Sequence, residues 1–260
     1  MKKFSIYFIV VAFLFGCKKQ LSDVPQAPIV VKGYLYGNQP ISDIYLESVA
    51  TTREFEQQVN QPISNAEVQL KVNNEIIVLT PHSSKEGYYT SPDTVLVDAD
   101  YELLVNHEGQ TLTASCYVPP KPAVTDELAS QSTLSNPMPS DLILTLTWNL
   151  LDSDIEYLIS LTPNSEELEP LGFGEESGQF YDIFALPIKD NVATFNGSFF
   201  TYKGNHTVTV FSITKDYSNF LNYLPTSFDR SLYTAPNNIS NGYGVFAGLT
   251  GDEVEFTLAE

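Results

Sequence analysis

The sequence predicts an all-β protein built from two β-sandwich domains, with one short helix. Three observations support this fold class. Residues that favour strands, namely Thr, Val, Ile, Tyr and Phe, are abundant, and helix-forming residues are not gathered in long runs. Short segments alternate between apolar and polar residues, as half-buried strands do. Asn, Gly and Pro separate these segments at short intervals, as expected for turns between strands.

The chain begins with a segment that is typical of a secretory leader. Lys2 and Lys3 precede the apolar run Phe4–Phe15, which is too short to span a bilayer. The run ends in Leu14-Phe15-Gly16-Cys17, which resembles a bacterial lipoprotein box. The resemblance implies cleavage before Cys17 and acylation of this cysteine with fatty acids such as palmitate. We therefore expect a signal peptide at 1–16 and a lipidated tether at 17–28; the alternative is an ordinary signal peptide with an incidental cysteine.

The next ninety residues predict the first sandwich, at 29–118. Ala66–Val72 alternates strictly, and Asn73-Asn74 forms a tight turn into the following strand. The expected strands are Ile29–Tyr36, Ile44–Ala50, Ala66–Val72, Ile76–Thr80, Gly87–Ser91, Tyr101–Asn106 and Thr111–Val118. The segments Ile63–Val68, Gly87–Tyr89 and Asp100–Leu103 resemble strands of transthyretin-like or carboxypeptidase-regulatory-like domains, a likeness that implies fold but no catalysis.

Pro119-Pro120-Lys121-Pro122 marks the boundary between the domains, because proline-rich segments resist both helix and sheet. It opens a Pro- and Ser-rich linker at 119–140, and the second sandwich follows at 141–260. Its expected strands are Leu142–Asn149, Glu156–Thr162, Gln179–Leu186, Val192–Phe195, Asn205–Ile213 and Val254–Leu258. The first two resemble neighbouring strands of a fibronectin type III domain, which implies that Trp148 fills the core.

Tyr217–Leu224 is the one expected helix, with Asp216 as N-cap and Pro225 as stop. Phe220 would face the core. After the helix we expect a long loop over Thr226–Gly251, of a length that is usually functional or packed by its own aromatic residues.

The net charge of −19 excludes binding to nucleic acid, which needs clustered Lys and Arg. It also argues against attraction to anionic lipid, so the acyl chains would provide the anchor. The chain has two cysteines, and with Cys17 lipidated Cys116 has no disulfide partner. Cys116 lies in an alternating segment, which predicts a small buried hydrophobe and not a nucleophile.

The sequence shows no recognised catalytic or metal-binding motif, so we expect no enzyme activity, no cofactor and no metal. The histidines His82, His107 and His206 lack metal-ligand spacing. The pairs Asp98/Asp100 and Asp152/Asp154 have the chemistry of calcium ligands but lack a binding loop, which favours solvated turns. Paired loop carboxylates of the glycosidase type are a third, least favoured interpretation. The candidates are Glu166, Glu167, Glu169, Glu175 and Glu176.

Several motifs together resemble family 4249 of the domains of unknown function. They are the lipoprotein box, Val30–Leu35, Ile63–Val68, Asp216–Tyr223 and Pro236–Gly248. Members are outer-membrane lipoproteins that are often encoded near TonB-dependent transporters, so the resemblance implies that location and such a partner, without an established activity. Asn241-Gly242 stands where members commonly have two glycines; Asn tolerates a positive φ, so the turn can be kept.

The glycine-rich part of this motif is the candidate for partner docking, at Gly242, Tyr243, Gly244, Val245 and Phe246. The alternative is a packed structural crossover. The expected function is that of a non-catalytic outer-membrane lipoprotein, an accessory or docking subunit of a TonB-dependent transporter. An independent surface adhesin or glycan-binding module is the alternative, and a hydrolase is less favoured. The sequence leaves open whether the protein faces the surface or the periplasm.

Overall fold

A computed structural model describes residues 27–49, 60–128, 138, 140–164, 183–184, 187–200, 202–226 and 236–258. The lipid-anchor candidate Cys17 and the glutamates between 166 and 176 lie outside this part of the chain. The expected all-β class is confirmed, because the described segments are mainly strands with a single α-helix. Within the same segments, no helix has both the length and the apolar character that a membrane span requires.

The first sandwich packs two groups of strands face to face. One group contains β1 (Ile29–Tyr36), β2 (Pro40–Val49), β3 (Asn60–Pro62) and β6 (Tyr88–Thr94). The other contains β5 (Glu75–Pro81), β4 (Glu67–Val72), β7 (Ala99–His107), β8 (Gln110–Val118) and β15 (Ile239–Ser240). The alternation that predicted these strands places Val31, Leu70 and Leu103 in one buried core. β3 lies outside the strands that the sequence predicted.

The second sandwich has the strand arrangement of a fibronectin type III domain. A three-stranded sheet contains β13 (Val192–Asn196), β10 (Leu142–Trp148) and β9 (Val124–Leu128). It faces β12 (Ile183–Phe184), β11 (Ile155–Pro163), β14 (Gly204–Thr214) and the end of β16 (Tyr243–Leu258), and a 3-10 turn at Gly197–Phe199 follows β13. Trp148 is 2% exposed in the core between the sheets, with its ring centroid 5.3 Å from that of Tyr157. The structural role expected for Trp148 is therefore confirmed.

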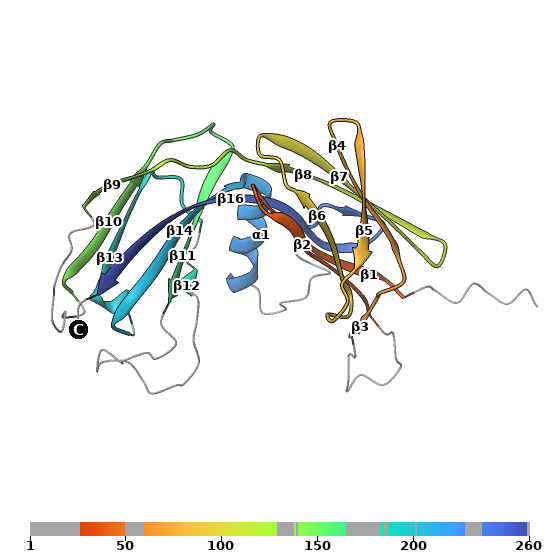
Figure 1. Ribbon diagram of the computed structural model, residues 1–260, viewed down its shortest axis with the longest axis horizontal. Coiled ribbons are helices and arrows are strands. Elements are labelled where there is room, and N and C mark those ends of the chain that lie inside the picture. The colour runs from red at the N-terminus through yellow and green to blue at the C-terminus, as the bar shows by residue number, and fades with distance from the viewer. Residues whose placement is uncertain are drawn as a thin grey trace, which may run out of the picture.

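Strand β16 belongs to both sandwiches and joins them into one continuous sheet (Figure 1). Its first half pairs in parallel with β1, from Tyr243 to Leu249, and its second half pairs antiparallel with β14, up to Leu258. The long loop expected over Thr226–Gly251 is therefore wrong from Ile239 onward, where β15 and β16 lie, and residues 227–235 lie outside the described part of the chain. Its glycines, which disfavour strands in general, concealed this strand.

The junction between the sandwiches is held by side chains that bond the proline segment. The hydroxyl of Thr250 donates to the carbonyl oxygen of Pro119 at 2.6 Å, and that of Ser212 donates to Pro120 at 2.7 Å. Lys121 pairs with Asp252 at 2.7 Å. The segment expected to be a linker is thus fixed to β14 and β16, and β9, which also lies in it, is part of the second sandwich.

Helix α1 (Lys215–Thr226) lies in the angle between the two sandwiches (Figure 1). Its buried residues Tyr217 and Phe220 pack against Val245 and Leu249 of β16. Tyr217 also contacts the ring of Tyr34 from β1, at 5.9 Å between centroids. The predicted helix and the inward position of Phe220 are confirmed, although the helix starts before Asp216 and includes Pro225 in its last turn.

Candidate functional site

Of the five residues expected to dock a partner, four form the start of β16, in the middle of the sheet, and Gly242 directly precedes it. Val245 and Phe246 are 5% and 1% exposed, and Gly244 is also buried. Gly244 has φ +115°, and a Cβ atom there would lie 1.9 Å from the carbonyl oxygen of Val31. Gly242 and Tyr243 are half-buried. These facts fit the alternative of a packed crossover, because the side chains of Val245 and Phe246 are almost entirely buried within the protein.

The asparagines that precede β16 form side-chain hydrogen bonds to the backbone, and this role accounts for their presence in the motif. The side chain of Asn238 accepts from the backbone N–H of Phe246 at 3.0 Å and donates to its carbonyl at 2.7 Å. Asn237 bonds the backbone of Ile239 and donates to the carbonyl of Gly242 at 3.0 Å. Side-chain amides therefore replace ladder bonds where the chain crosses from one sheet of the sandwich to the other.

A groove runs along the line where the two sandwiches meet. It consists of two hollows, of about 950 Å³ and about 400 Å³, which share Tyr117, Thr214 and Asp216 in their walls. Val245 and Phe246 line the smaller hollow, so the docking candidates lie beneath the groove. The start of α1, the end of β8 and the loop before β11 position the polar side chains.

The walls of the groove are acidic. The two carboxylate pairs that stood out in the sequence come from different sandwiches, and the fold brings them to one place. The side chains of the smaller and larger hollows include Asp98, Asp100, Asp152, Asp154 and Asp216. In the described segments, no group of three or more His, Cys, Asp or Glu residues has the geometry of a metal site. The arrangement is suited to hydrogen bonds from hydroxyl or amine groups of a ligand.

Tyr117 lies where the two hollows of the groove meet, and its hydroxyl is influenced by carboxylates from both sandwiches. Its hydroxyl donates to Asp98 Oδ1 at 2.6 Å. This hydrogen bond, aided by desolvation and by the charges of Asp98, Asp100 and Asp152, raises the pKa of Tyr117 to about 12. The sequence could not reveal this cluster, because its members are separated by about fifty residues and meet only through the fold.

Substitution Asp98→Asn is expected to lower the pKa of Tyr117 towards the ordinary value of about 10. Because the folded-state pKa is raised, Tyr117 contributes stability that is present below pH 10 and is lost as the pH rises through its folded value of about 12. NMR titration of ring-labelled tyrosine measures the shift. Asp100→Asn is the control and should shift the pKa less, because Asp100 acts on Tyr117 only through its charge. An unchanged midpoint in Asp98→Asn would contradict the assignment.

The other candidate residues have structural roles or lie outside the described segments. His206 is 2% exposed and stacks on Phe256 at 5.3 Å, and burial lowers its pKa. His82 Nδ1 accepts from the backbone of Ser84 at 3.1 Å in a turn. Cys116 is partly buried, and burial raises the pKa of its thiol, in agreement with an inert cysteine. The glutamates proposed for hydrolysis have no described position.

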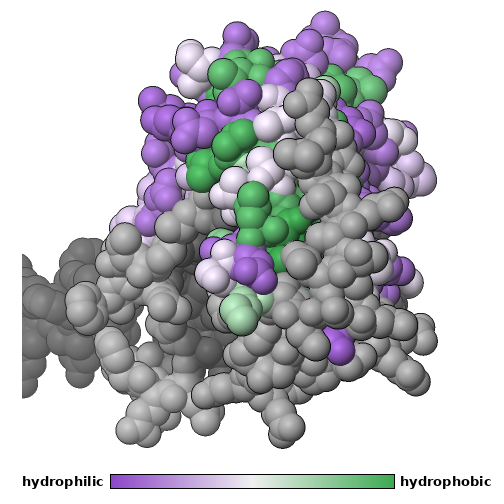
Figure 2. Space-filling model, turned by 90° about the vertical axis from the view of Figure 1, so that its left-hand side faces the viewer, coloured by the Kyte–Doolittle hydropathy of each residue, from purple (hydrophilic) through white to green (hydrophobic). Residues whose placement is uncertain are grey.

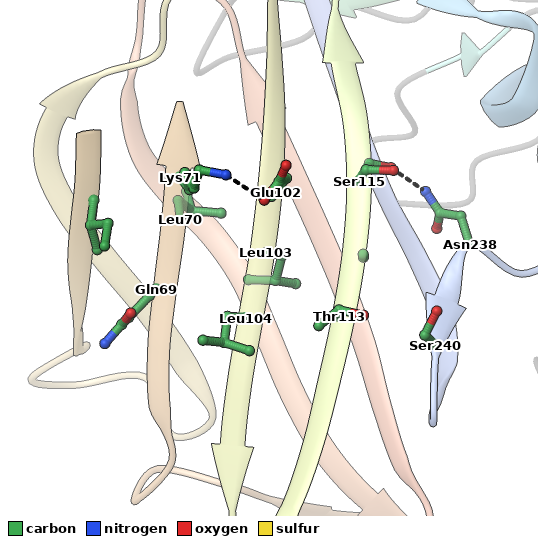
Figure 3. A pocket seen from close by; sticks show the side chains of 12 residues that line it. Gln69, Leu70, Lys71, Glu102, Leu103, Leu104, Thr113, Ser115, Asn238 and Ser240 are labelled. Carbon is green, nitrogen blue, oxygen red and sulfur yellow. Dashed lines mark hydrogen bonds and ion pairs between the residues drawn. The ribbon is translucent and has the colours of Figure 1, made fainter. Parts of the chain in front are cut away.

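Two outer surfaces lie away from the groove: an apolar area on the second sandwich and a hollow on the first. Figure 2 shows apolar residues in the middle of the face at the end of the second sandwich. In the strands of this sandwich, Leu142 is 62% and Val192 is 44% exposed. Figure 3 shows side chains that line a hollow on the outer face of the first sandwich. The volume of this hollow is about 530 Å³. Lys71 and Glu102 form an ion pair of 3.0 Å across its floor. Because these two charges neutralise each other, this hollow offers less to a charged ligand than the groove does.

No protein with a curated description matches the chain. Among solved structures, the FN1–FN3 domains of chicken CNTN1 are 12% identical, with a TM-score of 0.28, over 90% of this chain and 67% of that one. A bacterial ice-binding adhesin is 13% identical, with a TM-score of 0.22, over 90% of this chain and 66% of the other. TM-scores this low carry no argument about fold or function. The model of a family described as "Domain of unknown function (DUF4249)" matches residues 19–254, and the chain belongs to this family.

Proposed function

We propose that the chain is a non-catalytic lipoprotein of the outer membrane, anchored through Cys17, that serves as an accessory or docking subunit of a TonB-dependent transporter. The observation that carries this proposal is the junction between the sandwiches. A shared strand and the bonded proline segment make them one stiff body, with the groove at a fixed place between them. A docking subunit needs such a preformed surface, because rigid surfaces lose less entropy on binding.

The lipid anchor and the groove have separate parts in this proposal. The acyl chains on Cys17 hold the protein at the membrane, since the net charge of −19 opposes attraction to anionic lipid. The segment 18–26 gives the first sandwich some reach from the membrane. The groove around Tyr117 then contacts the transporter or the ligand that it imports.

Affinity purification of the full chain from membranes solubilised in mild detergent tests the proposal. We expect an outer-membrane barrel protein to co-purify. Tyr117→Ala and Asp152→Asn should reduce its yield, whereas Lys71→Ala, which lines neither hollow of the groove, should not. Cys17→Ser should release the chain from the membrane fraction. If no barrel protein co-purifies with the correctly anchored chain, the proposed function is wrong.

A glycan-binding adhesin is the second candidate, and the chemistry of the groove favours it. Carboxylates and asparagine amides bond sugar hydroxyls, and the ring of a tyrosine such as Tyr117 can pack against a sugar face. Binding of the chain to a glycan array, lost in Tyr117→Ala, would favour this function if no transporter co-purifies.

A further inference from the structure

In the first sandwich, strand β5 has an edge that is largely unpaired. This strand pairs with β4 from Glu75 to Leu79, but with β6 only through Thr80 and Pro81. The next hydrogen-bonded pair in the β5–β6 ladder would join Val78 to Pro92. Proline has no N–H to donate, so the ladder stops there. The backbone of β5 between Glu75 and Leu79 therefore has no partner strand on this side among the described residues.

The unpaired groups on this edge belong to Ile76 and Val78. Asn73 and Asn74 both have positive φ, as in the two-residue turn of a tight hairpin, which makes Val72 and Glu75 a hydrogen-bonded pair. Hydrogen-bonded pairs alternate along an antiparallel ladder, so the N–H and C=O of Ile76 and Val78 point away from β4. Their side chains are 63% and 60% exposed.

The opposite edge of the same sheet is protected. β15 covers β8 at Thr113 and Ala114. On either side of this short pairing, Asn238 donates to the carbonyl of Ser115 at 3.1 Å (Figure 3), and Asn241 donates to that of Thr111 at 3.2 Å. Edge strands invite pairing with another chain unless side chains block them. The fold blocks this edge at β8 and leaves the edge at β5 open.

We propose that β5 pairs antiparallel with β5 of a second copy of this chain, about a two-fold axis at Ile77. This register places Ile76 opposite Val78 of the other copy, so that each such pair exchanges two backbone hydrogen bonds. Ile77 faces its own counterpart in a non-hydrogen-bonded pair, where Cα atoms are about 4.5 Å apart. The same strand thus supplies both halves of an isologous interface, as two-fold symmetry requires.

The charge distribution favours a second copy in this register. The whole chain carries −19, yet the five residues of the edge include one charge, on Glu75. Glu75 lies opposite Leu79, so the two Glu75 residues are four residues apart along the strands, or about 14 Å. That exceeds the Debye length of about 8 Å at physiological salt. A five-residue edge is small beside a standard interface, so the dimer is weak and depends on local concentration. This inference does not depend on the proposed function.

Cysteine crosslinking of the full chain in intact cells tests the register. Ile77→Cys should give a disulfide-linked dimer under mild oxidation, because Cα atoms at this pair lie within disulfide range. Glu75→Cys is the matched control on the same strand and should crosslink at least about tenfold less, because its counterpart lies far outside that range. The unsubstituted chain gives the background from Cys17 and Cys116.

A second variant separates pairing from random collision. Adding Val78→Lys to Ile77→Cys should abolish the dimer by placing a charge on the edge, while Val78 is exposed enough for the fold to remain intact by protease resistance. The proposal is overturned by no crosslink at position 77, by equal crosslinking at 75 and 77, or by a crosslink at 77 to a different protein. The last result would assign the edge to a foreign strand.

Discussion

Replacing Gly244 with alanine is expected to destabilise the folded chain severely. Gly244 has φ +115°, and an added Cβ would lie 1.9 Å from the carbonyl oxygen of Val31 and 3.0 Å from its backbone nitrogen. Both atoms belong to β1, which cannot move without breaking its pairing with β2 and β16. We expect a loss of more than about 4 kcal/mol, which is a large part of the stability of an ordinary domain. Urea denaturation followed by circular dichroism measures it.

Gly109→Ala is the matched control for this prediction. Gly109 has φ +82°, but nothing lies within 4 Å of an added Cβ atom. It therefore isolates the backbone cost of a positive φ, which is about 1–2 kcal/mol for a residue with a side chain. If Gly244→Ala were destabilised no more than Gly109→Ala, the parallel pairing of β1 with β16 would be incorrect.

The sequence predicts the elements of both sandwiches well, because each is set by a local pattern. Alternation and a two-residue turn are enough to place Ala66–Val72 and the strand after it. The observed strands are Glu67–Val72 and Glu75–Pro81, so most of their ends differ from the predicted ends by one residue. The inward position of Trp148 was implied by the resemblance of its strand to one of a fibronectin type III domain. In these segments burial and local preference point to the same structure.

The beginning of β16 could not be predicted, because its glycines serve a contact with a distant strand. Gly248 gives the clearest case: an added Cβ atom would lie 2.5 Å from the carbonyl oxygen of Tyr117 in β8. Glycine inside a strand can indicate such close approach of two backbones, and this was the available signal. A glycine in a strand does not show which other strand approaches it. Neither the shared strand nor the groove beside it therefore follows from the sequence.

The groove could not be predicted either, because it also depends on contacts between distant parts of the chain. Asp98 and Asp152 each look like an acidic residue in a solvated turn, and locally each is one. Their common position depends on the angle between two sandwiches, which is fixed by β16 and by the hydroxyls of Thr250 and Ser212. A long-range arrangement of this kind leaves no periodic trace in the sequence.

Phe246→Ala is expected to destabilise both sandwiches together, although its side chain lies in the core of the first. Phe246 is 1% exposed and packs with residues of β1, β2 and β8. Removing a buried phenyl ring costs about 3–5 kcal/mol. Because β16 continues into the second sandwich, the loss should appear there with the same magnitude. The chain would then unfold in one transition and not domain by domain.

The chain contains a natural probe in each sandwich for this test. Trp148, its single tryptophan, reports the second core by fluorescence, and Cys116 reports the first by its reactivity in a Cys17→Ser background. In guanidinium, both probes should show the same midpoint, and Phe246→Ala should lower both midpoints equally. Phe199→Ala, at a residue 36% exposed outside the shared strand, should give a clearly smaller shift. Exposure of Cys116 at a lower denaturant concentration than the change at Trp148 would show that the sandwiches unfold independently. In that case the shared strand would not couple them, and the stiff junction on which the proposed docking function depends would be lost.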